Sequence, residues 1–350
     1  VICRYVAKGI RVADAVRIAG MNKSTYYYRP NGRSKGKQPS THTLYLGNPV
    51  SNQVVVDEIM QLIDPEYHDY GYQVLTDLLR QKGYRINYKK VYRLMNENNL
   101  LHPPTKKSAS LNKTFIKYSV PPLEGPFRTI EADIKYVYIH EENRNAFLVT
   151  FLCTFCRYAP VWDLQYAMKS KDIAKLVCDL LNDPDVKRYR EEQKIKIMIR
   201  TDNGPQFIAK ALAGTLESLG IAHEFIQPAT PQQNAHIESF HNTVTRLVCK
   251  RNIFQNLRHA RDIFKGFFQA YNETRVMRSL LCHTPKEFLK LWEQGIVGIK
   301  KNKWNREIFF FKEKPHPETG IGSSPEDLHR IIKNNIFESL VLKPLEISPV

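Results

Sequence analysis

The spacing of apolar residues changes once along the chain, and the change separates two kinds of structure. Up to about residue 100, apolar residues recur every three or four positions, as in Val74, Leu75, Leu78 and Leu79. This is the spacing of amphipathic helices. From residue 129 onward, apolar runs of strand length come first and then alternate with helix-like segments. The pattern predicts helical modules followed by an α/β domain, a mixed sheet with helices packed on both faces.

Two segments of the helical part have the pattern of a helix-turn-helix. Residues 12–28 predict a helix, a turn at Gly20 and a second helix with Asn22 or Ser24 as its N-cap. Farther along, Gly83 follows the leucine-bearing helix and precedes another helix. Asn87 can cap that helix, whose predicted buried residues are Val91, Leu94 and Met95.

The polar face of this last helix carries Lys89, Lys90 and Arg93. A solvated helix face is the plain interpretation of these cations. The adjoining basic segments favour DNA contact, with the helix acting as a recognition helix. Lys23, in the second helix of the first segment, is a candidate of the same kind.

The rest of the chain supplies the remaining elements and boundaries. Strands are predicted at 129–139, 146–158, 160–165, 194–200 and 222–226, and helices at 170–181, at 206–219 and from 233. The predicted domains are a helix-turn-helix segment (1–30), a basic linker (31–51), a second helix-turn-helix DNA-binding domain (52–101), a linker (102–126), a sheet-based core (127–295) and a tail of unknown role (296–350).

Charge narrows the class of partner. The chain has 52 Lys and Arg against 35 Asp and Glu, a net charge of +17. Such an excess favours nucleic acid as the partner, with an acidic membrane surface second. The longest apolar stretch, 146–155, is half of the ~20 residues that a membrane span needs, so no membrane role is expected. The first residue is Val1, not Met, from which we expect a fragment or a processed or recoded product.

The six cysteines contain one C-x-x-C pair, Cys153 and Cys156, inside a predicted strand. No second Cys or His pair follows at zinc-finger spacing. Packing thiols in a reducing cytoplasm are favoured over a metal site.

Three acids in the core stand at strand or helix ends. Asp133 lies on the first strand, Asp202 ends another, and Glu238 lies near the start of a helix. Singly, Asp202 could cap the Asn203-Gly204 turn and Glu238 could be a first-turn helix acid. Together they would repel one another unless a divalent cation lay between them, and hard oxygen ligands favour Mg²⁺ or Mn²⁺. Glu131 has the same strand parity as Asp133 and is an alternative ligand.

The motifs around these acids resemble a known family. TDNGPQF with Asp202, NAHIESF with Glu238, the 35 residues between the two acids and the upstream Asp133 resemble the DDE core of retroviral-integrase-like transposases from bacterial insertion sequences. More narrowly, they resemble the OrfB-type product of the frameshifting group. YGYQVLTDLLRQKGYRINYKKVYRLMNENNL is similar to that group's helix-turn-helix, and YNETRVMRSLLCHTPKEF to its post-core signature.

The resemblance implies an RNase H-like fold and a polynucleotidyl transferase that performs DNA 3′-end cleavage and strand transfer. Asp133, Asp202 and Glu238 would hold two Mg²⁺ ions, with Mn²⁺ able to substitute. The partners implied are double-stranded DNA, as element ends and target, and further copies in a homodimer or larger synaptic assembly. A cytoplasmic location on the bacterial nucleoid follows. In the core, we expect DNA contacts from Asn203, Gln233, Asn234 and Arg246.

Two alternatives stay open. One is a catalytically decayed DNA-binding regulator derived from a transposase. Two departures from the family pattern favour it, because Thr245 replaces a basic residue and Met277 replaces a histidine, whereas the three intact acids count against it. Thr129 and Ile130 also stand where the family pattern has an aromatic residue. The other is a stand-alone RNase H-like nuclease, which would not need the N-terminal helical modules.

Overall fold

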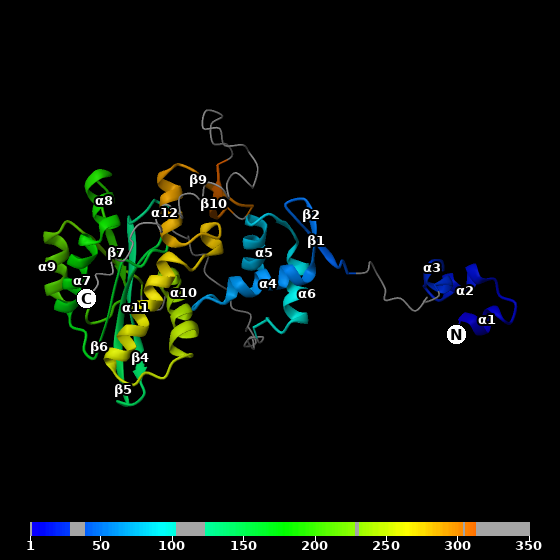
Figure 1. Cartoon of the computed structure of the whole chain (residues 1–350), viewed down its shortest axis with the longest axis horizontal. Helices are drawn as coiled ribbons and strands as arrows, with labels where there is room; N and C mark the ends of the chain where they lie inside the picture. Colours follow the sequence, from blue (N-terminus) through cyan, green and yellow to red (C-terminus); the bar gives the residue numbers. More distant parts are fainter. Residues whose placement is uncertain (1, 29–38, 103–122, 228–230, 304, 313–350) are drawn as a thin grey trace, which may run out of the picture. The chain divides into compact units, whose positions relative to one another are not determined.

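The chain forms two compact units in a computed structural model that describes residues 2–28, 39–102, 123–227, 231–303 and 305–312. The first unit is Val1–His42 and the second is Thr43–Val350. Within the first unit, helices α1 (Ile2–Val6), α2 (Val12–Ile18) and α3 (Lys23–Tyr27) follow one another (Figure 1). Gly20 has a φ of +62° between α2 and α3, and Asn22 is the N-cap of α3. Both confirm the predicted helix, turn and helix.

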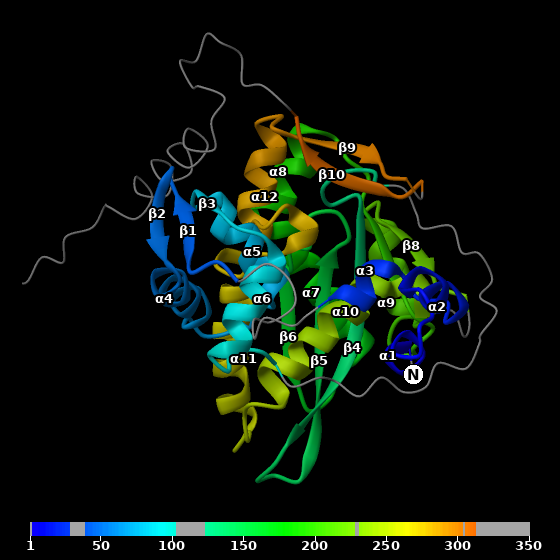
Figure 2. The same ribbon diagram turned by 90° about the vertical axis from the view of Figure 1, so that its right-hand side faces the viewer.

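The second unit begins with a small mixed module. Strands β1 (His42–Tyr45), β2 (Asn48–Ser51) and β3 (Tyr84–Arg85) form a sheet in the order β2-β1-β3, beside helices α4 (Asn52–Ile63), α5 (Tyr72–Gln81) and α6 (Tyr88–Glu97) (Figure 2). The linker predicted at 31–51 is therefore too long, because its second half pairs as β1 and β2. Its residues 31–38 lie outside the described residues, as do 103–122 of the linker predicted at 102–126.

The predicted helix α6 is confirmed in its cap and its core face. The Asn87 side chain accepts a hydrogen bond from the Lys90 backbone N–H at 2.9 Å. Val91, Leu94 and Met95 are buried in one hydrophobic cluster with α4 and α5. The opposite face is therefore left to polar side chains.

The module is held to the following domain by ion pairs around Asp69. Its carboxylate lies 2.9 Å from the guanidinium of Arg275 and is also paired with Arg246. Nearby, Arg278 contacts Asp77 at 2.9 Å. All three arginine pairs join segments about 170 or more residues apart, so the module is packed onto the core.

The core is built on a five-stranded sheet in the order β6-β5-β4-β7-β8. Its strands are β4 (Thr129–Ile139), β5 (Arg144–Cys153), β6 (Val161–Gln165), β7 (Met198–Thr201) and β8 (Ala222–Phe225). β4, β5 and β6 pair antiparallel, whereas β7 runs parallel to β4 and β8 parallel to β7. This mixed order, with the first strand central, is that of the RNase H-like fold and confirms the predicted class.

Alternation along the strands gives the sheet two apolar faces. On one face, Ile130 and Ala132 of β4 pack with α7 (Ser170–Asn182), α8 (Pro184–Glu192), α9 (Lys210–Ser218) and α12 (Pro285–Glu293). On the other, Val137 and Ile139 pack with α10 (Ala235–Val244), its π-helical continuation η2 (Thr245–Cys249) and α11 (Leu257–Glu273) (Figure 1). The short 3₁₀ turns η1 (Pro231–Asn234) and η3 (Arg278–Leu280) precede α10 and follow α11.

Several predicted bounds differ from the structure. β5 ends at Cys153 because the chain turns there, with Arg157 in the left-handed region at φ +59°. The helix predicted from Gln206 begins at Lys210, because Gly204 accepts backbone hydrogen bonds from Phe207 and Ile208 in a turn first. Pro205 therefore does not start a helix.

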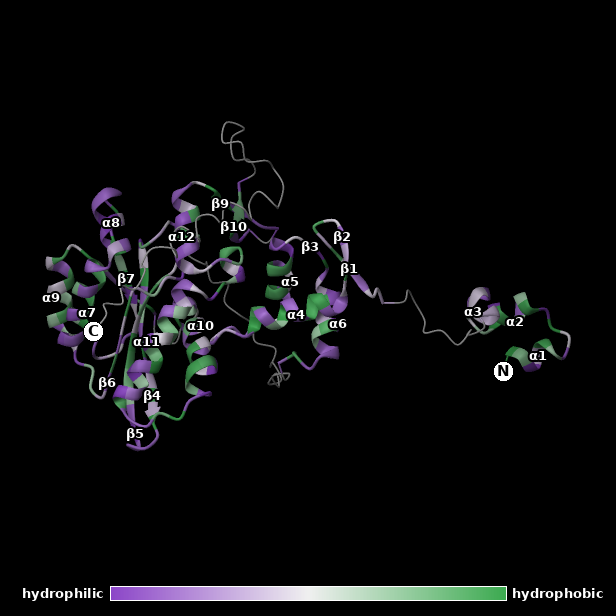
Figure 3. Ribbon diagram, in the orientation of Figure 1, coloured by the Kyte–Doolittle hydropathy of each residue, from purple (hydrophilic) through white to green (hydrophobic). Residues whose placement is uncertain are grey.

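Other elements have no counterpart in the prediction. Helix α8 is mostly hydrophilic (Figure 3), so its apolar periodicity is weak. In the region predicted as a tail, β9 (Val297–Lys301) and β10 (Glu307–Phe311) form an antiparallel hairpin that packs on the core through Val297 and Phe309. Among the described residues, no helix has both the length and the apolar character of a membrane span.

Candidate active site

Asp133 lies on the central strand, on the side that faces α10. It is half-buried, and its Oδ1 accepts a hydrogen bond from the Ile134 backbone N–H at 2.7 Å. Its Oδ2 lies 3.3 Å from Nδ1 of His241 on α10. The strand and the helix thus meet at this carboxylate.

Asp202 follows β7, the parallel neighbour of β4. The register pairs Thr129 with Met198 and Glu131 with Arg200. Continued by two residues, the same register sets Asp133 beside Asp202. The predicted juxtaposition of these two acids therefore follows from the pairing of their strands.

The Asp202 side chain also supports its own turn. Its Oδ1 accepts a hydrogen bond from the Gly204 backbone N–H at 3.0 Å. A Cβ on Gly204 would lie 2.9 Å from this oxygen, closer than real Cβ contacts. A side chain at position 204 would therefore press on the carboxylate of Asp202, whereas glycine leaves it in place.

Glu238 lies in the first turn of α10 and is exposed. Its pKa is raised, first by partial burial and then by the negative charge of Asp133. The two carboxylates therefore sense each other electrostatically, as acids that share a site do. Ile237 and Val244 on the same helix face the core.

His241 is a site residue that the sequence analysis missed. It follows Glu238 by three residues on α10, and it is 8% exposed. Besides its contact with Asp133, its Nε2 is buried without a hydrogen-bond partner in the described part of the chain. The spacing of three residues from Glu238 is the signal that could have suggested it, since such residues share a helix face.

Glu131, the alternative ligand, has a different position. It is 1% exposed, and its carboxylate accepts a hydrogen bond from the Ile237 backbone N–H at 2.8 Å. Arg200 lies 3.9 Å away. Burial raises the pKa of Glu131 to about 7 against the opposing effects of that hydrogen bond and of Arg200. Glu131 therefore links β4, β7 and the start of α10 one or two residues before each of the three acids.

The structure gives the contacts or the burial of each core residue that was predicted to bind DNA. The Asn203 side chain donates to the Ile226 carbonyl at 2.9 Å, and the Gln233 side chain accepts from the Gln227 backbone N–H at 2.7 Å. Asn234 is 3% exposed, so it lies inside the protein and could reach DNA only if α10 moved. Arg246 is paired with Asp69.

The predicted contacts of the helical modules lie on solvent-facing positions. Lys23 and Lys89 are exposed, and Lys90 and Arg93 are half-buried. Arg93 lies 3.2 Å from Glu97 in the next turn of α6. The polar face of α6 thus carries Lys89, Lys90 and Arg93, as predicted.

No ready metal site is seen in the part of the chain that the structure describes. No group of three or more His, Cys, Asp or Glu side chains there is arranged to hold an ion. Cys153 and Cys156 are both buried free thiols, and Cys153 Sγ accepts from the Phe127 backbone N–H. The packing interpretation of the C-x-x-C pair therefore agrees with the structure.

Comparison with known families divides the chain in the same way. Residues 124–231 match an integrase core domain, and residues 219–285 match a second model of the same description. Residues 51–108 match an HTH-like domain. These ranges correspond to the RNase H-like core and to the module that contains α4, α5 and α6.

Three curated relatives extend the comparison. The chain is 25% identical to the transposase for insertion sequence element IS904 of Lactococcus lactis, over 69% of this chain and 97% of that protein. It is 26% identical to an uncharacterized 39.2 kDa protein of insertion element IS476 from Xanthomonas euvesicatoria, over 78% and 71%. A 31.7 kDa protein of insertion element IS407 from Burkholderia multivorans is 25% identical, over 68% and 81%.

Proposed function

Because the chain carries an integrase core domain behind an HTH-like domain and is homologous to insertion-sequence transposases, we propose that Asp133, Asp202 and Glu238 form its catalytic triad. The chain is a transposase, a polynucleotidyl transferase that cuts and joins DNA strands. The finer proposal concerns which residues do this. Two observations support it: the β4–β7 register, which continued by two residues would set Asp133 beside Asp202, and the charge of Asp133, which raises the pKa of Glu238.

The three acids fit divalent cations of the hard type. Their donors are carboxylate oxygens, which Mg²⁺ prefers and Mn²⁺ accepts. The effect of Asp133 on the pKa of Glu238 means that the two negative charges repel, and a cation held by both would offset this repulsion. When bound, such ions supply Lewis-acid stabilisation to the phosphate that is attacked.

The surrounding residues would fix the positions of the acids. Glu131 holds the start of α10, and with it Glu238, against β4 through the Ile237 N–H. Arg200 contacts both Glu131 and Glu224, at 3.9 and 2.6 Å, two residues before Asp202. His241 contacts the Asp133 carboxylate. Each element that carries a triad residue thus also carries a polar contact close to that residue.

DNA recognition is assigned to the residues before 101. The polar face of α6 would enter a groove of the element ends, with Lys89 and Lys90 on phosphates and Arg93 on a base edge. Lys23 in the first unit would add a second contact. Transposition joins two element ends to one target, so we further propose that the chain acts as a homodimer or larger assembly on DNA.

The test is a set of conservative changes in the full chain. Asp133→Asn, Asp202→Asn and Glu238→Gln each remove a charge and little volume. Mutation of a residue that hydrogen-bonds to a metal ligand typically lowers metal affinity or activity by ~10–100-fold. Loss of a ligand itself should therefore reduce cleavage and strand transfer by more than ~100-fold. Binding to end duplexes, measured in Ca²⁺, should stay within a few-fold of the unmodified chain.

The matched control is Glu217→Gln, an exposed acid on α9, which should keep full activity. Full activity in any one of the three triad variants would remove that residue from the proposed site. Inactivity of the unmodified chain on its own ends, with binding intact, would instead identify a decayed DNA-binding regulator.

A further inference from the structure

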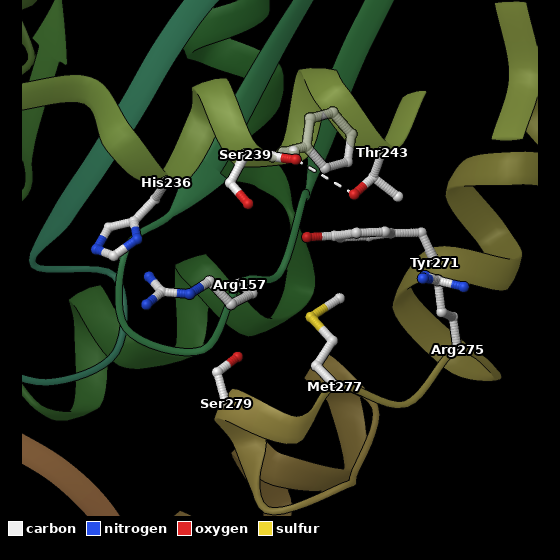
Figure 4. Close-up of a pocket in the computed structure, with 9 residues that line it drawn as sticks. Arg157, His236, Ser239, Thr243, Tyr271, Arg275, Met277 and Ser279 are labelled. Carbon is white, nitrogen blue, oxygen red and sulfur yellow. Dashed lines mark hydrogen bonds between the residues drawn. The ribbon is translucent and has the colours of Figure 1, made fainter. Parts of the chain in front are cut away.

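A cavity on the flank of α10 is lined by cations and hydroxyl groups. Its volume is about 200 Å³, and it lies among α10, the end of α11 and η3 (Figure 4). A water molecule takes about 30 Å³ in the liquid, so the cavity can hold a phosphate group with several waters. The lining includes two arginines, four hydroxyl groups and no carboxylate; the residues used below are Arg157, His236, Ser239, Tyr271 and Ser279.

Arg157 occupies a backbone position that is costly for any side chain. It sits in the tight turn after β5, where its backbone N–H donates to the Cys153 carbonyl at 3.0 Å. Its φ is +59°, in the left-handed region that is unfavourable for a residue with a Cβ. Glycine or asparagine would be the cheaper choice. A long cation kept at such a position points to a role for its side chain.

The charge of Arg157 is not matched by a close anion. In the described residues, no carboxylate lies within ion-pair distance of its guanidinium, which donates to the Thr154 carbonyl. The buried carboxylate of Glu131 already accepts a hydrogen bond from the Ile237 backbone N–H. His236 also lines the cavity, beside Arg157 (Figure 4). A cation largely removed from water needs a counter-charge to offset its desolvation.

Hydroxyl groups complete the lining. Ser239, Tyr271 and Ser279 direct their oxygens into the cavity from α10, α11 and η3 (Figure 4). Among the described residues, none of these three hydroxyls donates a hydrogen bond to another group. The Thr243 hydroxyl, by contrast, is used within α10, where it donates to the Ser239 carbonyl at 3.2 Å. The second arginine, Arg275, is already paired with Asp69. The cavity therefore offers Arg157 and three available O–H donors to an anion.

We propose that this cavity binds a phosphate group of the DNA strand that lies next to the catalytic triad. Phosphate oxygens accept from arginine and hydroxyl donors, and Ser239 directly follows Glu238 on α10. A phosphate held there would fix the strand beside the bond that is cut. The inference rests on the proposed function, since it takes the site at Glu238 to act on DNA.

The test measures DNA binding by the full chain without divalent metal. The probe is a set of end duplexes in which one phosphate at a time is replaced by a neutral methylphosphonate. We expect one position at which the unmodified chain loses about tenfold in affinity. The Ser239→Ala/Ser279→Ala double variant should bind the normal duplex with about tenfold lower affinity. Replacing the phosphate at the sensitive position should then cause this variant no further loss of affinity. Arg157→Lys, which keeps the charge, should lose less than the double variant.

The matched control is Ser218→Ala, whose hydroxyl on α9 donates to the Thr215 carbonyl; it should show the same sensitive position as the unmodified chain. A double variant that remains sensitive there would overturn the proposal. A second arm follows thermal unfolding with inorganic phosphate at constant ionic strength. Stabilisation of the unmodified chain alone, with no sensitive DNA position, would assign the cavity to free phosphate and overturn the DNA assignment. Because no metal is present, failure of the triad would not change either arm.

Discussion

The carboxylates of the core and the cations of α6 show two ways of holding charge. Around the core acids, Glu131 and Arg200 are largely buried, and Nδ1 of His241 lies 3.3 Å from the Asp133 carboxylate. On α6, Lys89 is exposed to solvent, and Arg93 lies 3.2 Å from Glu97 one turn away. The core set makes contacts between distant segments, whereas the cations of α6 share one helix.

The difference matches two physical tasks. In-line chemistry needs its groups held within a fraction of an ångström, which a buried network can do. Phosphate contacts on a duplex tolerate movement, because the attraction is electrostatic and long side chains adjust to it. Changes in the core should therefore alter rate with little effect on affinity, and changes on α6 should do the reverse.

The strongest challenge to this division is Asp69, which joins the two regions. Its side chain is 3% exposed and is paired with Arg246 and Arg275. Asp69→Asn leaves two arginines without their anion, and breaking a buried pair costs about 3–5 kcal/mol. We expect a lower midpoint of urea unfolding, with Asp262→Asn on exposed α11 surface as the control. An unchanged midpoint would mean that the module and the core are energetically separate.

A change at Glu131 tests whether the buried residues of the core position the three acids. Glu131→Gln keeps an acceptor for the Ile237 N–H but removes the charge that faces Arg200. Loss of such a supporting partner should reduce strand transfer by ~10–100-fold and raise the Mg²⁺ concentration needed for half-maximal activity. DNA affinity should not change. Activity within twofold of the unmodified chain would show that the network does not position the acids.

Gly204 tests the packing around Asp202. In Gly204→Ala, the new Cβ would press on Asp202 Oδ1 and turn the carboxylate away. We expect about a tenfold loss of activity, at the lower end of the ~10–100-fold seen for supporting changes. Gly214→Ala is the matched control, because nothing lies within 4 Å of its Cβ and α9 should gain stability. Equal activity of the two variants would contradict the role given to Gly204.

The cations of α6 should give the smallest effects. Lys89→Ala should weaken binding to end and scrambled duplexes alike and lower the salt slope by about one. Arg93→Ala should cost ~1–3 kcal/mol at a single base pair only. Lys171→Ala, an exposed lysine of α7, is the control. A salt-titrated binding assay separates these results, and loss of strand-transfer rate at saturating DNA in either α6 variant would break the division.

Local patterns predicted the elements that depend on local physics. β4 is found at the predicted residues because alternation marks a strand with two apolar faces, and Asn87 caps α6 because a cap needs only its own next turn. The acids were identified by motif and by their places at strand and helix ends. What sequence could not supply are contacts across the fold. Glu131 with Ile237, and Asp69 with Arg275, join segments more than 100 residues apart.

The division between chemistry and recognition is tested most directly by metal binding without catalysis. Titration of the full chain with Mn²⁺, followed by the electron paramagnetic resonance signal of free Mn²⁺, counts bound ions and their affinity. The account predicts that Asp133→Asn, Asp202→Asn and Glu238→Gln each lose or greatly weaken Mn²⁺ binding, while Glu217→Gln and Lys89→Ala bind as the unmodified chain does. Unchanged Mn²⁺ binding in all three triad variants would contradict it and place the metal elsewhere.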